Sequence, residues 1–273
     1  TVIYGMDADL IMLSLNHKKY TKSIYLYRET PQFIQSLDSS LDPQDKYLID
    51  INKLGDQIYE LLTTETNSES FDENSRNMLY YTKIHDYILI CFLLGNDFMP
   101  HFPAINIRST GITILLDLYK SVLGVNKNLT KDGEIIWSNF KMFIGKLAEN
   151  EKQFILDSYR LRERQAKRFY PENTQQEKED KFNFIPSWER NIEEFINPYE
   201  NYWEYRYYYS LFDIDIDKDN SAISNICNNY LQTLQWTFTY YSQECVNWKH
   251  YYKYEYPPLL SDLYKHIPYF ASE

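Results

Sequence analysis

Three aspartates follow apolar runs at two places in the chain. Asp7 and Asp9 come soon after the run that begins at Val2, and Asp97 follows the apolar stretch that ends at Leu94. An apolar strand that ends in Asp-x-Asp puts carboxylates at the carboxyl edge of a sheet, where open α/β folds bind ligands. Carboxylate oxygens are the ligands that divalent cations such as Mg²⁺ prefer. The three residues are therefore our candidates for one metal site.

Each motif also has a purely structural interpretation. Asp9 stands before Leu-Ile-Met-Leu and fits the N-cap of a helix, because its side chain can accept a hydrogen bond from an amide of the first turn. Gly95 and Asn96 before Asp97 fit the capped C-terminus of a helix, and Pro100 gives that end a stiff exit. Residue types and spacing alone leave both interpretations open.

The elements that would position these residues differ between the two parts of the chain. In residues 1–110, short extended runs alternate with helical ones, which predicts part of an α/β domain. In residues 111–273 the apolar pattern is helical throughout. We expect extended runs at 1–4, 23–28 and 47–51, helices at 9–15, 53–62, 78–94, 112–122, 135–169, 187–212 and 223–241, a polar loop at 63–77 and a flexible polar segment near 171–181.

Composition restricts the class of protein. With 273 residues, of which 44% are hydrophobic, the chain can bury a full core. It has no apolar run of the roughly 18 residues that a membrane span needs, and residues 1–4 do not resemble the basic region or the cleavage site of a signal peptide. We therefore expect a soluble cytoplasmic or nuclear protein without a membrane partner. Its three cysteines are far apart, which indicates neither a disulfide framework nor a zinc site. A net charge of −11 disfavours a protein that coats nucleic acid by bulk electrostatics.

Taken together, the motifs resemble those of the XRN family of 5′→3′ exoribonucleases. Residues 4–13 read Tyr-Gly-Met-Asp-Ala-Asp-Leu-Ile-Met-Leu, similar to the family's Tyr-Gly-x-Asp-Ala-Asp-Leu-Ile-x-Leu. Residues 95–101 are similar to its Gly-Asn-Asp-Phe-x-Pro-His, and residues 251–258 to its Tyr-Tyr-x-Tyr-x-Tyr-x-Pro. The resemblance is weaker at residues 245–250, where His250 stands in place of a second tryptophan.

The resemblance implies a PIN/flap-nuclease-like α/β domain followed by a helical region that completes the nuclease core. It implies hydrolysis of single-stranded RNA with a 5′-monophosphate, by two Mg²⁺ or Mn²⁺ ions that about seven carboxylates hold. Asp7, Asp9 and Asp97 match three of those carboxylates. The others, two aspartates and a Glu-x-Glu pair, have no candidate in this sequence and are expected on an upstream segment. The chain, which opens directly on a strand, is therefore expected to be a fragment that is inactive alone.

Two alternatives stay open. Flap-type structure-specific DNA nucleases share the strand-end Asp-x-Asp and the Gly-x-Asp turn, but they continue with a glycine-rich helix-hairpin-helix, and residues 102–107 contain no glycine. The chain also fits a catalytically inactive remnant that binds RNA or serves as a scaffold. The basic residues between Arg160 and Arg168 are interpreted as a solvated helix face rather than an RNA track.

Overall fold

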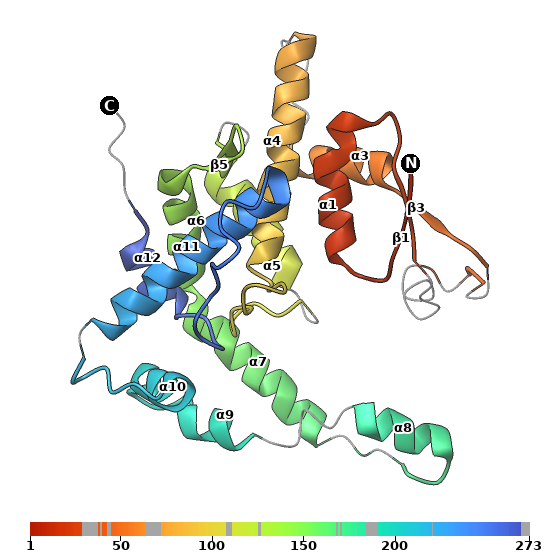
Figure 1. Cartoon of the computed structure of the whole chain (residues 1–273). Helices are drawn as coiled ribbons and strands as arrows, with labels where there is room; N and C mark the ends of the chain where they lie inside the picture. The colour runs from red at the N-terminus through yellow and green to blue at the C-terminus, as the bar shows by residue number, and fades with distance from the viewer. Residues whose placement is uncertain are drawn as a thin grey trace.

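Helices make up most of the structure, a computed structural model that describes residues 1–28, 38, 40–42, 45–63, 72–107, 111–124, 127–167, 169, 171–183, 190–219 and 221–268 (Figure 1). The helices are α1 (Asp9–His17), α3 (Ile51–Leu62), α4 (Glu73–Phe92), α5 (Gly111–Leu123), α6 (Trp137–Glu149), α7 (Glu151–Ala166), α8 (Gln175–Asn183), α9 (Asn191–Ile196), α10 (Trp203–Phe212), α11 (Ala222–Ser242) and α12 (Leu260–His266), with a short 3₁₀ turn at Lys18–Tyr20. The strands are β1 (Val2–Tyr4), β2 (Tyr25–Tyr27), β3 (Leu48–Asp50), β4 (Thr130–Lys131) and β5 (Glu134–Ile135).

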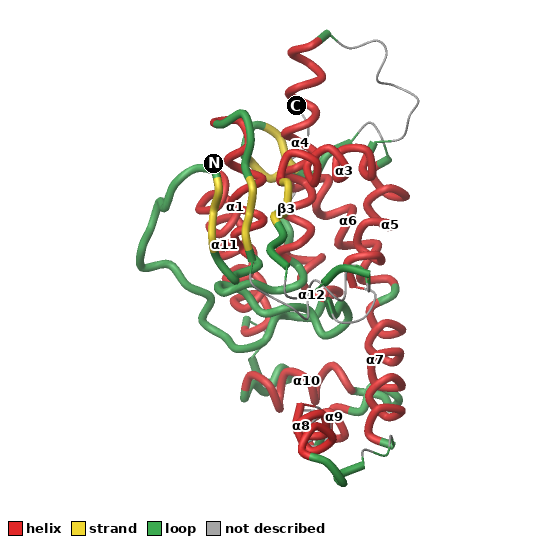
Figure 2. The backbone as a smooth tube through the Cα atoms, turned by 90° about the vertical axis from the view of Figure 1, so that its right-hand side faces the viewer, coloured by secondary structure: helices red, strands yellow, loops and turns green. Residues whose placement is uncertain are grey.

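A small three-stranded sheet lies beside α1 and α3 (Figures 1 and 2). Strand β2 is central and pairs in parallel with β1 and antiparallel with β3, so that Tyr25 lies opposite both Val2 and Asp50. The side chain of Asp50 then caps α3, because it accepts hydrogen bonds from the amides of Asn52 and Lys53. The three extended runs expected at 1–4, 23–28 and 47–51 each contain one of these strands.

The longest helices, α4 and α11, pack against each other at the centre of the molecule, and α11 crosses α4 in Figure 1. The last turns of α4 are buried on nearly every side, with Leu89, Ile90 and Phe92 at most 2% exposed. The edge of the Phe92 ring meets the ring of Tyr241 on α11 at a centroid distance of 4.9 Å. Helix α1 also packs on α4 and α11, and this packing joins the sheet to the helical part.

A fully buried polar network attaches the short β4–β5 hairpin to α4. The carboxylate of Asp86 accepts hydrogen bonds from the backbone amides of Leu129 and Thr130, at 2.9 and 2.7 Å. It also accepts a hydrogen bond from the hydroxyl of Tyr119, which in turn accepts one from the ammonium of Lys83 at 2.7 Å. The buried carboxylate is thus satisfied on both oxygens, as burial of a charged group requires.

Helix α7 leads away from this core to α8, α9 and α10 (Figures 1 and 2). Composition predicts a flexible segment near 171–181, whereas the structure has a helix, α8, over much of it. A capping box starts this helix: Thr174 accepts a hydrogen bond from the amide of Glu177, and the Glu177 carboxylate accepts hydrogen bonds from the amides of Asn173 and Thr174. Local hydrogen bonds therefore form a helix that almost no apolar burial supports.

Other boundaries differ from those expected. The helix expected at 135–169 is two helices that meet at Asn150. Residues 187–189 lie outside the described part of the chain, and the rest of the helix expected at 187–212 is α9 and α10, separated by residues 197–202, in which Asn197 and Tyr202 have positive φ of +41° and +61°. Helix α4 starts at Glu73, within the loop expected at 63–77, because Asp72 caps it. The chain after residue 110 also contains the β4–β5 hairpin, which was not expected.

The division of the chain at residue 110, and the assignment of the small sheet to a PIN-like domain, stay predictions.

No helix in the described part of the chain is both long and apolar enough to cross a membrane.

Candidate metal centre

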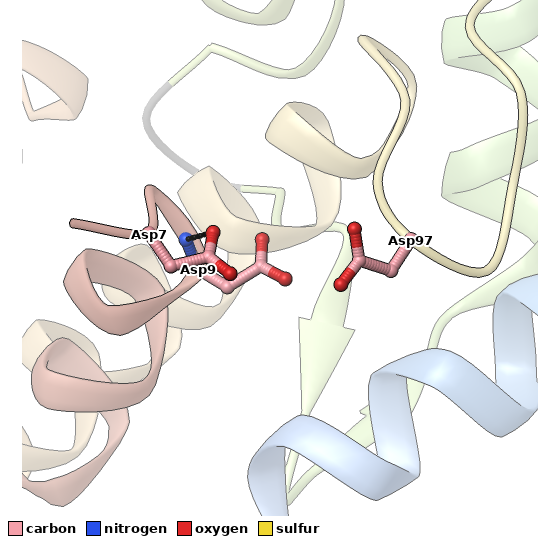
Figure 3. A group of neighbouring side chains, drawn as sticks. All are labelled: Asp7, Asp9 and Asp97. Atoms are coloured by element: carbon pink, nitrogen blue, oxygen red, sulfur yellow. Dashed lines mark hydrogen bonds between the residues drawn. The ribbon is translucent and has the colours of Figure 1, made fainter. Parts of the chain in front are cut away.

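The fold brings the carboxylates of Asp7, Asp9 and Asp97 together (Figure 3). One oxygen of each residue can be chosen so that all three lie within 4.8 Å of one another. Asp7 and Asp97 are exposed and Asp9 is half-buried. Among the residues that the structure describes, this is the one group of three or more metal-binding side chains with such spacing. The metal-ligand role of these residues stays a prediction, but their convergence is a property of the fold.

Asp7 and Asp9 belong to the tight turn between β1 and α1. The turn is close-packed at Gly5, because a β-carbon there would lie 2.2 Å from Cδ1 of Leu10. The carboxylate of Asp7 accepts a hydrogen bond from the amide of Asp9 at 3.2 Å, drawn in Figure 3. The N-cap residue of α1 is Ala8 and no side chain caps the helix, so the capping interpretation of Asp9 is wrong. Its carboxylate points into the space shared with Asp97 instead.

Asp97 projects from a turn that follows α4. Gly95 has a φ of +91°, and the chain then forms a narrow loop in which Asn96 and Met99 make a reciprocal backbone bridge. The side-chain oxygen of Asn96 accepts hydrogen bonds from the amides of Phe98 and Met99 at 2.9 and 3.1 Å. Asp97 is therefore held at the tip of a turn whose backbone is fixed on both sides.

Aromatic side chains on α11 form a cluster that packs against the turns carrying the three aspartates. Phe98, directly after Asp97, makes edge contacts with the rings of Trp236 at 5.1 Å and Tyr240 at 5.5 Å. Trp236 and Tyr240 are themselves stacked at 5.3 Å with an interplanar angle of 3°. In Figure 3 the ribbon of α11 passes beneath the aspartates. Tyr241 also belongs to this cluster, and burial together with the neighbouring Asp9 raises the pKa of its hydroxyl.

The proximity of Tyr241 to the acids is not predicted by the sequence analysis. No local signal could have found it, because Tyr241 lies on a helix at the opposite end of the chain. In place of the family's second tryptophan, His250 packs against Trp236 at a centroid distance of 5.7 Å and makes a hydrogen bond with Thr233 at 3.0 Å. His250 thus extends the aromatic cluster of α11.

The electrostatics of the site disfavour the charged form of Asp9. Partial burial raises the pKa of Asp9 above its usual range; the hydrogen bond with Tyr241 opposes this rise, and the nearby carboxylates of Asp7 and Asp97 add to it. A bound cation would reverse the repulsion between these groups. The arrangement thus concentrates negative charge that a cation would neutralise.

The donor set fits Mg²⁺ or Mn²⁺. All three candidate ligands are carboxylates, the ligands of hard cations, and no thiol or imidazole is among them. Neighbouring oxygens on one octahedral Mg²⁺ ion lie about 3.0 Å apart, given Mg–O distances of about 2.1 Å. The three oxygens lie within 4.8 Å of one another, so the side chains would have to move closer together to share one ion.

Other titratable and basic side chains have structural partners. His85 on α4 is half-buried with its ring edge-on to Phe238, and burial lowers its pKa to about 4. In the described part of the basic stretch, Arg160 pairs with Asp157 and Arg162 pairs with Glu193. Both contacts agree with the interpretation of this stretch as a helix face rather than an RNA track.

Comparison with known proteins gives a family match. The model of the Xrn1 helical domain matches residues 81–193 and 189–268, ranges that together cover more than half of the chain. Asp97 and the aromatic cluster of α11 lie inside the matched ranges, whereas Asp7 and Asp9 precede them.

Individual relatives agree with this match. The chain is 23% identical to the 5′-3′ exoribonuclease 1 of Homo sapiens, over 96% of this chain and 17% of the human protein. It is 24% identical to the 5′-3′ exoribonuclease 2 of Gallus gallus, over 85% of this chain and 30% of that protein. A shorter match to the 5′-3′ exoribonuclease 2 of Arabidopsis thaliana reaches 36% identity over 32% of this chain and 9% of the plant protein. The chain thus spans less than a third of the length of these relatives.

Proposed function

The chain belongs to the XRN family of 5′→3′ exoribonucleases, and on that basis we propose that it forms part of the catalytic core of a divalent-metal-dependent enzyme that degrades single-stranded RNA from a 5′-monophosphate end. In this proposal Asp7, Asp9 and Asp97 are metal ligands, and Mg²⁺ or Mn²⁺ ions are the cofactors. The small sheet with α1 and α3 is part of a PIN-like α/β nuclease domain, and the helices that follow complete the core.

One observation carries the proposal: carboxylates from two distant segments converge. Asp7 and Asp9 follow strand β1 and Asp97 follows helix α4, yet their oxygens lie within 4.8 Å of one another. The three carboxylates repel one another, and a bound cation would balance their charge.

The residues of this chain would hold the ions and fix their position. When bound, such ions lower the pKa of a water nucleophile and stabilise charge on the leaving oxygen of a phosphodiester. The β1–α1 turn presents Asp7 and Asp9 side by side, and the Asn96–Met99 turn presents Asp97 from the opposite side. The aromatic cluster of α11 keeps the two turns at a fixed separation.

Three carboxylates are fewer than two divalent ions require, because four positive charges call for more oxygen ligands than these side chains supply. We propose that further acidic ligands come from an upstream segment of the same polypeptide, and that this segment also contributes contacts to the 5′-phosphate of the RNA. This would make the activity a property of the longer protein.

The test is an exonuclease assay of the full-length protein with single-stranded RNA that carries either a 5′-monophosphate or a 5′-hydroxyl. We expect Mg²⁺-dependent degradation of the monophosphorylated RNA, little degradation of the hydroxyl form, and loss of activity with EDTA. Asp97→Asn should lower kcat by a hundredfold or more, because the amide keeps the shape of the side chain but removes a charged ligand.

The matched control is Asp117→Asn, the same substitution at an exposed position of α5, which should retain wild-type activity. Full activity of Asp97→Asn would contradict the proposed ligand. Cleavage of flap DNA but not RNA would favour a structure-specific DNA nuclease, and binding of RNA without cleavage would favour an inactive scaffold.

A further inference from the structure

Tyr241 connects three separate segments of the candidate metal centre. It lies one residue before the end of α11 and is only 4% exposed. Its ring meets the ring of Phe92 at the end of α4, at 4.9 Å and 72°. It also meets the ring of Phe98, beside Asp97, at 6.4 Å and 90°. Packing on two sides leaves the Tyr241 ring little freedom to rotate.

The backbone of Tyr241 holds the helix that begins at Asp9. The side-chain amide of Asn16, in the last turn of α1, donates a buried hydrogen bond to the carbonyl oxygen of Tyr241 at 3.0 Å. Asn16 is only 5% exposed, so this contact is shielded from competing water. This contact fixes the position of α1 along α11. It therefore also fixes the position of the Asp9 carboxylate at the start of α1.

The hydroxyl of Tyr241 is coupled to the carboxylate of Asp9: burial and then Asp9 raise the pKa of the hydroxyl, and Tyr241 opposes the rise that burial causes in the pKa of Asp9. Repulsion from Asp7 and Asp97 favours rotation of the Asp9 carboxylate away from them. A hydrogen bond from a hydroxyl whose ring is held by Phe92 and Phe98 would oppose that rotation. Hydrogen bonds to ligating carboxylates are a common way to orient a metal ligand.

We propose that Tyr241 is a positioning residue for the divalent-cation site: its hydroxyl fixes Asp9 in the orientation that binds the ion, while its ring and backbone fix the separation between the Asp9 and Asp97 turns. This inference rests on the proposed function, because it assumes that the aspartates bind a cation. It adds a residue from the far end of the chain to the machinery of the site.

The test is Mn²⁺ binding to the full-length protein without RNA, measured by electron paramagnetic resonance and titration calorimetry. Tyr241→Phe keeps the ring against Phe92 and keeps the carbonyl that Asn16 contacts, but it removes the hydroxyl. We expect Mn²⁺ affinity to fall about tenfold or more, while the thermal midpoint changes little in the absence of metal.

Tyr209→Phe is the matched control. Tyr209 is an exposed residue of α10 that stacks on Tyr205, so loss of its hydroxyl should leave Mn²⁺ affinity unchanged. A double-mutant cycle adds a second readout: in an Asp9→Asn background the effect of Tyr241→Phe on affinity should largely disappear, because the hydroxyl acts through the Asp9 carboxylate.

Three results would overturn the inference, and they are distinguishable. If Asp97→Asn weakens Mn²⁺ binding but Tyr241→Phe binds Mn²⁺ as the wild type does, the metal site stands and the positioning role fails. If neither variant changes Mn²⁺ binding, the aspartates are not a cation site, and the proposed function fails together with the inference. An equal effect of Tyr241→Phe with and without the Asp9 carboxylate would also reject action through Asp9.

Discussion

Asp97 comes close to Asp7 and Asp9 because the chain reverses direction at Gly95, two residues before it. At Gly95 the backbone is in the left-handed region, with φ +91°, and a β-carbon would lie 3.0 Å from the amide nitrogen of His101. Both facts favour glycine, the first because side chains strain this conformation and the second because the space is already filled. The motif therefore encodes the geometry of the turn as well as the acid.

Gly95→Ala should lower the free energy of unfolding by about 2–3 kcal/mol, because the left-handed conformation alone costs an alanine about 1–2 kcal/mol and the contact with His101 adds to it. Mn²⁺ affinity should fall as well, since the turn that presents Asp97 shifts. Urea denaturation and Mn²⁺ titration measure the two effects.

Gly124→Ala provides the control for Gly95→Ala. Gly124 also has positive φ, +59°, but a β-carbon there would meet only the carbonyl oxygen of Lys120, at 4.0 Å. Its substitution should cost about 1 kcal/mol and leave Mn²⁺ affinity unchanged. Equal losses of stability in the two variants would show that the contact with His101 does not matter.

Single residues also show which parts of the site the sequence can predict and which parts it cannot. The acids were recognisable because each follows an apolar run and because their motifs resemble a family. Tyr241 was not recognisable from the sequence, because its proposed role depends on α11 crossing α4 and reaching the start of α1. Only the packed structure places these segments together.

At the scale of elements, the sequence predicts best where an amphipathic or apolar pattern is long. The expected ranges of α3, α5 and α11 agree with the structure to within two residues. The pattern fails where it continues across a break, as at Asn150 between α6 and α7, or where local capping forms a helix without apolar burial, as in α8. It also misses the β4–β5 hairpin, whose strands have two residues each and are held by Asp86 of another element.

Helix α12 depends on a carboxylate from α7. Glu151 is buried and accepts hydrogen bonds from the amides of Leu260 and Ser261, the first two residues of α12. These amides have no partner within the helix. Burial raises the pKa of Glu151 to about 7, although the two amide hydrogen bonds oppose the rise. The folded protein therefore binds this proton more tightly than the unfolded chain does.

This shift predicts a pH dependence of stability. Between pH 4.5 and 7, the ordinary and the raised pKa of Glu151, the folded state holds more protons than the unfolded state, so the contribution of Glu151 to the free energy of unfolding falls as pH rises. The wild type should lose about 3 kcal/mol relative to Glu151→Gln across this range. Urea denaturation of both proteins at pH 4.5 and 7.5 measures the difference.

Glu149→Gln is the control for this prediction, because Glu149 is exposed and pairs only with Lys146 at the surface. Its stability should follow that of the wild type at both pH values. A constant difference between the wild type and Glu151→Gln at pH 4.5 and 7.5 would show that the buried carboxyl does not titrate in this range.

For the whole molecule, the central claim is that the fold assembles one cation site from its two ends and its middle. The sheet and α1 bring Asp7 and Asp9, α4 brings Asp97, and α11 holds the two turns together (Figures 1 and 3). The match to the Xrn1 helical domain covers α11 and the segment with Asp97, whereas Asp7 and Asp9 precede the matched residues.

The most direct test of this claim is anomalous diffraction at the manganese edge from crystals of the full-length protein soaked in Mn²⁺. We predict an anomalous peak among Asp7, Asp9 and Asp97, at about 2.2 Å from at least one oxygen of each, and its loss in Asp97→Asn crystals. A map with Mn²⁺ bound elsewhere and no peak among these three carboxylates would contradict the account.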